Sequence, residues 1–445
     1  MKFDEHPTVL RYRETVAPSL MANMETLDAA WLRQLALEAG ADDAGCVSLS
    51  RTELDEQRTG ILQCFPQAKT LLSFVLRMNR ENIRSPARSI ANLEFHHSGG
   101  EVNEIARRIV SRLERQGIAA INPAMGFPME AQRWPNKMWV VSHKPVAEAA
   151  GLGRIGIHRN IIHPVFGNFI LLGTVVLDAE IADDARPIDY NPCLECKLCV
   201  AACPVGAIAP DGRFDFSACY THNYREFMGG FTDWVETVAA SGSAKNYRKK
   251  VDDAESVSMW QSLSFGANYK AAYCLAVCPA GDDVIGPFLD DKKDFIKRVV
   301  RPLQDKEETI YAVSNSDAEQ HVTRRFPHKR VKPVKNSLRP TSIKAFLNGL
   351  PLVFQPGKSA GLSATYHLTF SGTENIEATV VIRNQQLEIL AGHSGQADFQ
   401  LHADGKVWLQ FLAKEKHLVW ALCQRKIRFK GSPRLLLAFG RCFLA

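Results

Sequence analysis

The chain has 445 residues, a formal net charge of +6, 46% hydrophobic residues and 23% charged residues. This length exceeds what a single hydrophobic core usually serves, so it predicts two to four domains. The composition is that of an ordinary globular protein and excludes a disordered or collagen-like chain.

The first twenty residues mix acids and bases without an apolar core, which is not the pattern of a secretory signal. No run of eighteen apolar residues occurs anywhere. We therefore expect a cytoplasmic protein without an integral membrane segment.

Helix and strand patterns alternate over residues 20–187. Thr26 or Asp28 can cap a helix that ends at Gly40, and an amphipathic helix is expected over 102–115. Strands are expected over 44–49, 70–75, 118–121 and 169–177. The last is an uninterrupted aliphatic run, typical of a strand buried on both faces. The pattern predicts an α/β domain.

Three further regions complete the chain. Residues 188–290 hold most of the cysteines, and 291–341 read as a charged helix and a basic linker. Within 321–344 there are eight basic residues, three prolines and no acid, which predicts a solvated linker; an anionic partner, nucleic acid and a membrane surface are the less favoured interpretations. Residues 342–445 predict an α+β domain, with strands at 366–370, 377–382 and 386–389 and helices at 407–418 and 434–439.

Seven of the eleven cysteines cluster between residues 193 and 278. They are Cys193, Cys196, Cys199, Cys203, Cys219, Cys274 and Cys278. A cluster of this kind in a cytosolic protein indicates metal rather than a disulfide framework. The other four, Cys46, Cys64, Cys423 and Cys442, are isolated in apolar surroundings and are expected to be small buried core residues.

The spacing Cys193-x2-Cys196-x2-Cys199-x3-Cys203-Pro204 is the bacterial ferredoxin run. Three thiolates on a tight loop can bind one corner of a cubane, and the fourth points to a neighbouring cluster. Tetrahedral zinc also accepts such x2 spacings, but four cysteines this close, with a proline directly after the last, favour an iron–sulfur cluster.

The ending Cys274-x3-Cys278-Pro279 repeats the ending of the first motif. By the exchange rule of two-cluster ferredoxins, Cys278 completes the first cluster, and Cys203 joins Cys219 and Cys274 in the second. A full second motif would have a cysteine at Ala271. The second cluster therefore has three evident thiolates. Its fourth ligand is a non-cysteine side chain such as His222 or a distant cysteine, or else the cluster is three-iron.

The segments Lys144–Gly153 (KPVAEAAGLG), Arg154-Ile155-Gly156, Pro164-x2-Gly167 and Arg186–Asp189 precede the first cysteine in that order. This arrangement, over about residues 25–290, resembles the epoxyqueuosine reductases and the reductive dehalogenases. The resemblance implies an α/β domain that holds base-off cobalamin. It also implies two [4Fe–4S] clusters that reduce the cobalamin. It places Gly151, Gly153, Gly156 and Gly167 on loops that line the corrinoid.

A departure from the family pattern limits the resemblance. Lys137 stands where epoxyqueuosine reductases carry a proton-donating Asp, which argues against queuosine chemistry. His143, Tyr220 and Tyr224 are candidate proton donors that also have ordinary structural interpretations, so the catalytic residues stay unassigned. GLGRIG also fits a dinucleotide fingerprint, but the preceding residues are helix-like and Pro164 interrupts the segment after it, which disfavours a Rossmann site.

The C-terminal region resembles a sterol-carrier-type lipid-binding domain. The residues that carry the resemblance are FLNGLPLVFQPGKSAGLSATYHLTF, then Leu401–Asp404 and Lys426–Gly431. The resemblance implies a sheet covered by helices around an apolar tunnel for a hydrophobic small molecule or lipid. The alternative is a closed domain that serves only assembly.

These patterns support three hypotheses. The first is an iron–sulfur oxidoreductase with an active site in the α/β domain, reduced by an electron donor such as ferredoxin or flavodoxin. The second is an electron-transfer protein that docks through the basic linker. The third is a lipid-linked redox sensor in which the incomplete second cluster responds to oxygen or a ligand.

Overall fold

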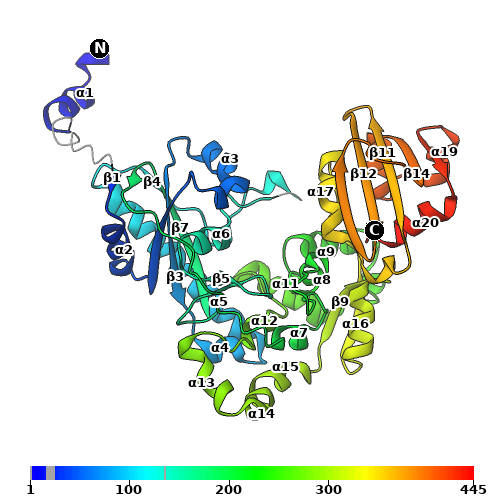
Figure 1. Ribbon diagram of the computed structural model, residues 1–445, viewed down its shortest axis with the longest axis horizontal. Coiled ribbons are helices and arrows are strands. Elements are labelled where there is room, and N and C mark those ends of the chain that lie inside the picture. The colour runs from blue at the N-terminus through cyan, green and yellow to red at the C-terminus, as the bar shows by residue number, and fades with distance from the viewer. Residues whose placement is uncertain (1–2, 17–25, 135–136, 445) are drawn as a thin grey trace. The chain divides into compact units, whose positions relative to one another are not determined.

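The computed structural model describes residues 3–16, 26–134 and 137–444 (Figure 1). The described chain forms two compact units. The first unit lies within residues 1–134, 138–196 and 275–296, and the second within 135–137, 197–274 and 297–445. The cysteine region, expected as one domain over 188–290, is thus divided between them.

A four-stranded sheet forms the centre of the first unit. Its strand order is β2 (Asp43–Ser48), β3 (Thr70–Arg77), β7 (Ile170–Leu177) and β4 (Ala120–Ile121), and every pair is antiparallel. Along the β3–β7 pair, Thr70 is opposite Leu177 and Arg77 is opposite Ile170. Strand β7 is buried along nearly its whole length, as its aliphatic run predicts.

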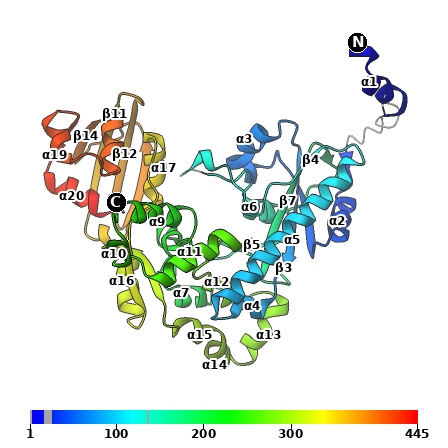
Figure 2. The ribbon, with the colours of Figure 1, turned by 180° about the vertical axis from the view of Figure 1, so that it is seen from behind.

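Helices cover both faces of this sheet (Figures 1 and 2). One face packs against α2 (Ala29–Glu38) and α5 (Arg88–Glu114), and the other against α3 (Asp55–Cys64) and α6 (His143–Ala149). Asp28 caps α2 by accepting the Ala30 N–H at 2.8 Å. Helix α5 begins fourteen residues earlier than predicted, because its first half is polar and lacks an apolar stripe that the sequence could reveal.

The remaining elements of the first unit are short. They are α1 (Pro7–Arg11), α4 (Arg80–Arg84), α13 (Asp282–Asp290), α14 (Lys292–Phe295), the parallel pair β1 (Thr26–Leu27) and β8 (Glu180–Ile181), and the hairpin β5 (Arg154–Ile155) and β6 (Ile161–Ile162). The chain passes from the second unit back to the first within helix α12 (Tyr273–Ala276).

The second unit begins with a helical region that carries four of the seven clustered cysteines. Its helices are α7 (Leu198–Ala202), α8 (Phe216–Asn223), α9 (Gly229–Ala239), α10 (Ala244–Arg248), α11 (Asp253–Phe265) and α15 (Arg301–Gln304). A small βαβ element comes next, in which β9 (Thr309–Val313) and β10 (Arg330–Val334) pair in parallel and α16 (Asp317–Arg325) connects them.

The expectation of a solvated basic linker was wrong, because α16 and β10 occupy much of it. Five of its eight basic side chains pair with acids that lie elsewhere in the second unit, namely Lys329, Arg330, Lys332, Lys335 and Arg339. Lys329 contacts Glu308 at 2.8 Å, and Arg339 contacts Glu236 at 2.6 Å. The sequence pattern cannot show these pairs, because the acids are distant along the chain.

The C-terminal part of the second unit is a five-stranded sheet covered by helices. The strand order is β13 (Gln386–Ala391), β12 (Ile376–Arg383), β11 (Ala364–Ser371), β14 (Phe399–Asp404) and β15 (Ile427–Gly431), and only β11 and β14 are parallel. The helices are α17 (Ile343–Val353), α18 (Gly405–Leu412), α19 (Leu418–Cys423) and α20 (Pro433–Arg441). The single helix expected over 407–418 is instead interrupted after Leu412, close to Lys414 with its left-handed φ of 60°.

Among the described helices, none combines the length and apolar character that crossing a bilayer requires.

Candidate iron–sulfur centre

The motif that begins at Cys193 lies on a loop with two left-handed turns. Glu195 and Lys197 adopt φ values of 48° and 60°, which are uncommon for residues with a side chain. Helix α7 starts directly after Lys197 and ends at Cys203, whose N–H donates to the Cys199 carbonyl. The backbone therefore turns sharply between successive cysteines, as a loop that folds around a cofactor must.

In the first unit, Cys193 and Cys278 pack together. Both lie against Ile162 and Ala280 in a small apolar cluster. Arg84 lies close enough to Cys278 for their charges to interact, and its guanidinium stacks on Phe169 and Phe295. A nearby guanidinium favours the thiolate, which is the form that ligates iron. The place of Cys193 and Cys278 in one apolar cluster agrees with the exchange rule, while ligation itself stays a prediction.

In the second unit, Cys203 and Cys219 share an apolar cluster with Ala218, Ile310 and Ala312. Cys274 joins this group through Tyr224, whose hydroxyl interacts electrostatically with both Cys219 and Cys274. The three cysteines predicted for the second cluster thus lie around one region of the second unit.

The Cys203 sulfur is surrounded by backbone donors. The Ala207 N–H donates to Sγ at 3.3 Å, and the N–H groups of Val205, Gly206 and Ile208 also face it. Burial raises the pKa of the Cys203 thiol, and these N–H groups oppose that rise. A ring of amides around a buried sulfur stabilises negative charge on it, as a cluster ligand needs.

Ala271 occupies the position where a complete second motif would have a cysteine. Its N–H donates to Asn223 Oδ1 at 2.9 Å, which holds the 270–274 segment against the end of α8. His222 precedes Asn223 and is buried, and burial lowers its pKa to about 4. The ring is therefore neutral near pH 7.

The hydrogen bonding of His222 argues against iron ligation. Its Nδ1 accepts the Tyr311 N–H at 3.3 Å, so the proton of the neutral ring belongs on Nε2. A metal-bound histidine normally donates its second N–H rather than accepting there. Nε2 has no hydrogen-bond partner among the described residues. In this arrangement His222 Nε2 carries the proton and can donate a hydrogen bond, but it has no free lone pair for iron. The fourth ligand of the second cluster stays unassigned.

Single metal ions are a different case. Within the described part of the chain, no three His, Cys, Asp or Glu side chains are grouped so that they could hold one ion.

The candidate proton donors have structural contacts. Both ring nitrogens of His143 are engaged, by Thr174 Oγ1 at 2.9 Å and by the Ala124 carbonyl at 3.0 Å, and burial lowers its pKa. Tyr220 accepts the Gly229 N–H at 2.9 Å, and burial raises the pKa of Tyr220 and Tyr224. Lys137 is half buried, and residues 135–136 before it lie outside the described chain.

The four glycines predicted to line a corrinoid face the chain's own atoms. A Cβ would lie 2.6 Å from the Arg186 carbonyl oxygen at Gly151, and 2.3 Å from that of Ile162 at Gly153. At Gly156 it would lie 2.7 Å from the Ile162 side chain. At Gly167, where φ is 64°, it would lie 2.1 Å from the Ala280 carbonyl oxygen. Close packing within the chain is enough to explain these glycines, so their role in lining a corrinoid stays a prediction.

The isolated cysteines divide into two pairs. Cys46 and Cys442 are buried, as expected, but Cys64 and Cys423 are exposed, so the expectation that all four are core residues was wrong. Each of the exposed cysteines is the last residue of its helix, α3 or α19, where a side chain need not face the core.

Two family models match parts of the chain. Residues 186–209 match the 4Fe-4S binding domain, and residues 355–443 match the SCP-2 sterol transfer family. The chain carries a 4Fe–4S binding domain. Its C-terminal segment is similar to the sterol transfer family, as the sequence analysis suggested.

Similar proteins include epoxyqueuosine reductases. The protein from Gloeobacter violaceus is 28% identical over 182 residues, which are 40% of this chain and 54% of that protein. The protein from Aliivibrio fischeri is 32% identical over 162 residues, which are 36% of this chain and 41% of that protein. The chain thus spans about half the length, or less, of these curated relatives.

Similar solved structures include an epoxyqueuosine reductase and a reductive dehalogenase. The epoxyqueuosine reductase of Streptococcus thermophilus has 15% identity and a TM-score of 0.36, covering 61% of this chain and 74% of that chain. The catabolic reductive dehalogenase NpRdhA has 16% identity and a TM-score of 0.36, covering 61% of this chain and 34% of that chain.

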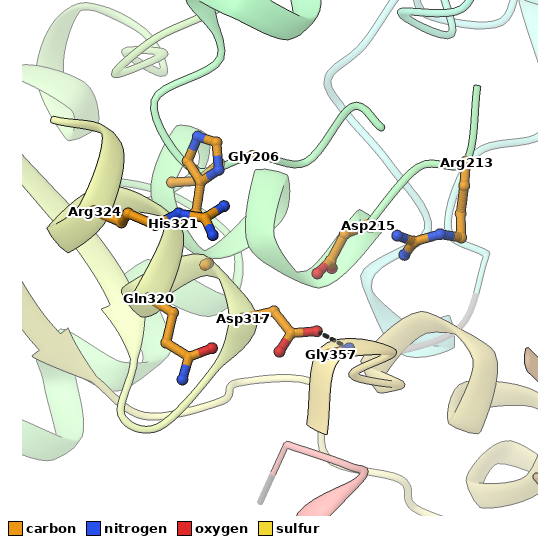
Figure 3. A pocket seen from close by; sticks show the side chains of 10 residues that line it. Gly206, Arg213, Asp215, Asp317, Gln320, His321, Arg324 and Gly357 are labelled. Atoms are coloured by element: carbon orange, nitrogen blue, oxygen red, sulfur yellow. Dashed lines mark hydrogen bonds between the residues drawn. The ribbon is translucent and has the colours of Figure 1, made fainter. Parts of the chain in front are cut away.

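A group of residues that the sequence analysis missed lies in the second unit, around Asp215, Asp317 and His321 (Figure 3). The Asp317-x3-His321 spacing was the available signal, because it places both side chains on one face of α16. It was hidden within a segment interpreted as linker.

Proposed function

We propose that the chain is an iron–sulfur oxidoreductase that passes single electrons to a substrate site at the 151–167 loops of the first unit. In this proposal Cys193, Cys196, Cys199 and Cys278 hold one [4Fe–4S] cluster, and Cys203, Cys219 and Cys274 hold a second. Such clusters, when bound, supply one-electron transfer.

One observation carries the proposal. Ala280, which packs with Cys193 and Cys278, also touches Gly167 at its backbone. The N–H groups of Asp282 and Asp283 donate to the carbonyls of Pro164 and Val165 at 2.9 and 3.1 Å. A cluster held by Cys193 and Cys278 would therefore lie directly behind the loops at which we place the substrate.

The residues around this position suit electron delivery. Ile162 and Ala280 pack beside the two cysteines, of which Cys278 is buried and Cys193 partly exposed, and the Arg84 guanidinium near Cys278 offsets negative charge. A dry surrounding and a fixed positive charge both influence a cluster's reduction potential. Packing within the chain already accounts for the glycines of these loops, so the proposal stops at electron delivery and includes no step through cobalamin.

The alternative of an electron-transfer protein docked by a basic linker is less well supported. Lys329, Lys332 and Arg339 contact Glu308, Glu255 and Glu236, so much of the expected positive charge is neutralised within the second unit. The lipid-linked sensor keeps one supporting observation, the similarity of residues 355–443 to the sterol transfer family.

Anaerobic purification and reconstitution test the proposal. Iron, sulfide and corrinoid are measured on one sample, before and after addition of cobalamin, and a reductive titration is then carried out. Seven or eight iron atoms and reversible one-electron reduction support the proposal. Fewer than about four iron atoms would remove the two-cluster assignment. Stoichiometric cobalamin uptake would extend the proposal to a cobalamin reductase, and no uptake would leave it as stated.

A further inference from the structure

The last part of the second unit is strongly basic. Residues 405–444 contain nine lysine and arginine side chains and a single acid, Glu415. Eight of the nine are exposed. In the described chain only Lys426 has an acid within ion-pair distance, Asp404 at 3.4 Å. Most of this positive charge therefore faces solvent without a neutralising partner. The nine are Lys406, Lys414, Lys416, Arg425, Lys426, Arg428, Lys430, Arg434 and Arg441.

Helix α20 places an apolar side chain between two of these cations. Arg434, Leu437 and Arg441 are three and four residues apart, so they lie on one face of the helix. All three are exposed, and Leu437 is 69% exposed. The opposite face, with Leu436 and Phe439, packs against the core of the domain. The core therefore does not explain Leu437, which is presented to solvent between two arginines.

Helix α19 has the same combination. Val419 is 71% exposed and Trp420 is 41% exposed. The Lys416 ammonium lies over the Trp420 ring, 4.4 Å from its centroid. Strand β15 connects α19 with α20 and exposes Arg428 and Lys430. Both helices lie at the outer edge of this domain (Figures 1 and 2). We call the exposed side chains of α19, β15 and α20 the C-terminal face.

The chemistry of this face fits a bilayer better than another polyanion. Exposed apolar side chains are ordinary where they are scattered singly, but here they lie beside unpaired cations. Lys and Arg are attracted to anionic lipid headgroups, and tryptophan is typical of the boundary between headgroups and hydrocarbon. Aliphatic side chains such as Val419 and Leu437 gain free energy only by leaving water. A bilayer offers that gain, whereas the phosphate backbone of a nucleic acid does not.

We propose that the C-terminal face docks on a bilayer that contains anionic phospholipid. Val419, Trp420 and Leu437 enter the headgroup region, and the surrounding lysines and arginines bind lipid phosphates. The contact is peripheral, because it uses only side chains at the surface of the domain. The face lies within the segment that is similar to the sterol transfer family, so docking brings that segment to the lipid surface.

Co-sedimentation of the full chain, purified anaerobically, with extruded vesicles tests this face. Vesicles of phosphatidylglycerol and phosphatidylcholine in equal parts are compared with vesicles of phosphatidylcholine alone. The anionic vesicles should bind the chain at least about tenfold more tightly, because several exposed cations face them. This difference should shrink as added salt screens the charges.

Two variants separate the charged and apolar parts of the contact. Arg434→Gln combined with Arg441→Gln should weaken binding to anionic vesicles about thirtyfold and reduce its salt dependence, because two cations are lost. Leu437→Ser should weaken binding about tenfold and leave the salt dependence unchanged, because only apolar contact is lost. Both substitutions are at exposed positions, so the domain should still fold.

Arg107→Gln and Leu263→Ser are the matched controls. Arg107 is an exposed cation on α5, and Leu263 is an exposed apolar residue on α11. Neither should change the affinity for vesicles. Equal affinity for both kinds of vesicle, or equal losses in the controls, would overturn the proposal.

A short RNA duplex is the competing probe. Binding of this duplex that is lost with the two arginines but kept in Leu437→Ser, without vesicle binding, would overturn the proposal in favour of a nucleic-acid surface. The proposal goes beyond electron delivery and does not rest on cluster binding. Iron is measured on the same samples, so failure of the two-cluster proposal is detected separately.

Discussion

Cys193 packs against the small apolar cluster that contains Cys278 in the first unit, although the two cysteines belong to different sequence motifs. Cys203, which belongs to the same motif as Cys193, instead packs beside Cys219 in the second unit. The last cysteine of each motif is thus associated with the other motif's group. This crossed arrangement is the one expected when two clusters exchange ligands, and ligation by these cysteines stays a prediction.

Gly167→Ala should destabilise the first unit by about 2 kcal/mol or more. Gly167 has a φ of 64°, and a Cβ there would lie 2.1 Å from the Ala280 carbonyl oxygen, so the new methyl group must displace backbone. Urea unfolding measures the change. Gly100→Ala is the control, because a Cβ at this exposed position in α5 meets nothing within 4 Å. Alanine there should be neutral or stabilise by up to about 1 kcal/mol. If the two variants changed the free energy of unfolding equally, the close approach of Gly167 to Ala280 would be contradicted.

His158 should make stability depend on pH between about 6.5 and 4. Burial, aided by the charge of Lys144, lowers the pKa of His158 from 6.5 to about 4. Within this interval the unfolded chain binds the proton and the folded chain does not, so stability falls as the pH falls. The full effect is about 3 kcal/mol. Unfolding midpoints measured at several pH values should show a shallower slope for His158→Gln. An unchanged slope would mean that other groups cause the dependence.

Arg225→Met should cost about 3–5 kcal/mol of folding free energy. Arg225 is buried and contacts two buried carboxylates, Asp233 at 2.6 Å and Glu255 at 3.2 Å. Removing the cation leaves the buried Asp233 carboxylate without its ion-pair partner, whereas Glu255 keeps its contact with Lys332. Denaturant unfolding measures the loss. Arg248→Met is the control, since its pair with Asp253 is exposed and 4.0 Å apart, and it should change stability by less than about 0.5 kcal/mol.

His222→Asn should leave the iron content unchanged. Asparagine keeps an acceptor for the Tyr311 N–H but removes Nε2, which would be the ligating atom if His222 bound iron. Iron and sulfide per chain are compared with those of the unsubstituted protein. A loss of one or more iron atoms would show that His222 is a ligand and that its hydrogen bonding rearranges when the cluster binds.

The sequence predicted well those features that depend on local pattern. The strand over 169–177 was visible because β7 is apolar throughout, and the helix capped by Asp28 was visible because the cap and the apolar stripe coincide. The cysteine motif is likewise local, so the 4Fe–4S domain could be recognised without a structure.

Features that depend on distant partners could not be predicted. The segment containing Lys329 and Lys332 looked like a solvated linker, because Glu308 and Glu255, which pair with them, lie elsewhere in the sequence. The glycines near residue 151 suggested a cofactor loop, but their neighbours are atoms of the chain itself that only folding brings close. The group around Asp215, Asp317 and His321 was missed because it combines residues from three separate segments.

Paramagnetic resonance of Cys278→Ser and Cys274→Ser, recorded on oxidised and reduced anaerobic samples, tests the central claim most directly. The two variants should each lose a different cluster signal, since Cys278 packs with Cys193 while Cys274 is grouped with Cys203 and Cys219. Cys64→Ser, at an exposed cysteine, should lose neither. Loss of the same signal in both variants would contradict two clusters held by separate groups of cysteines.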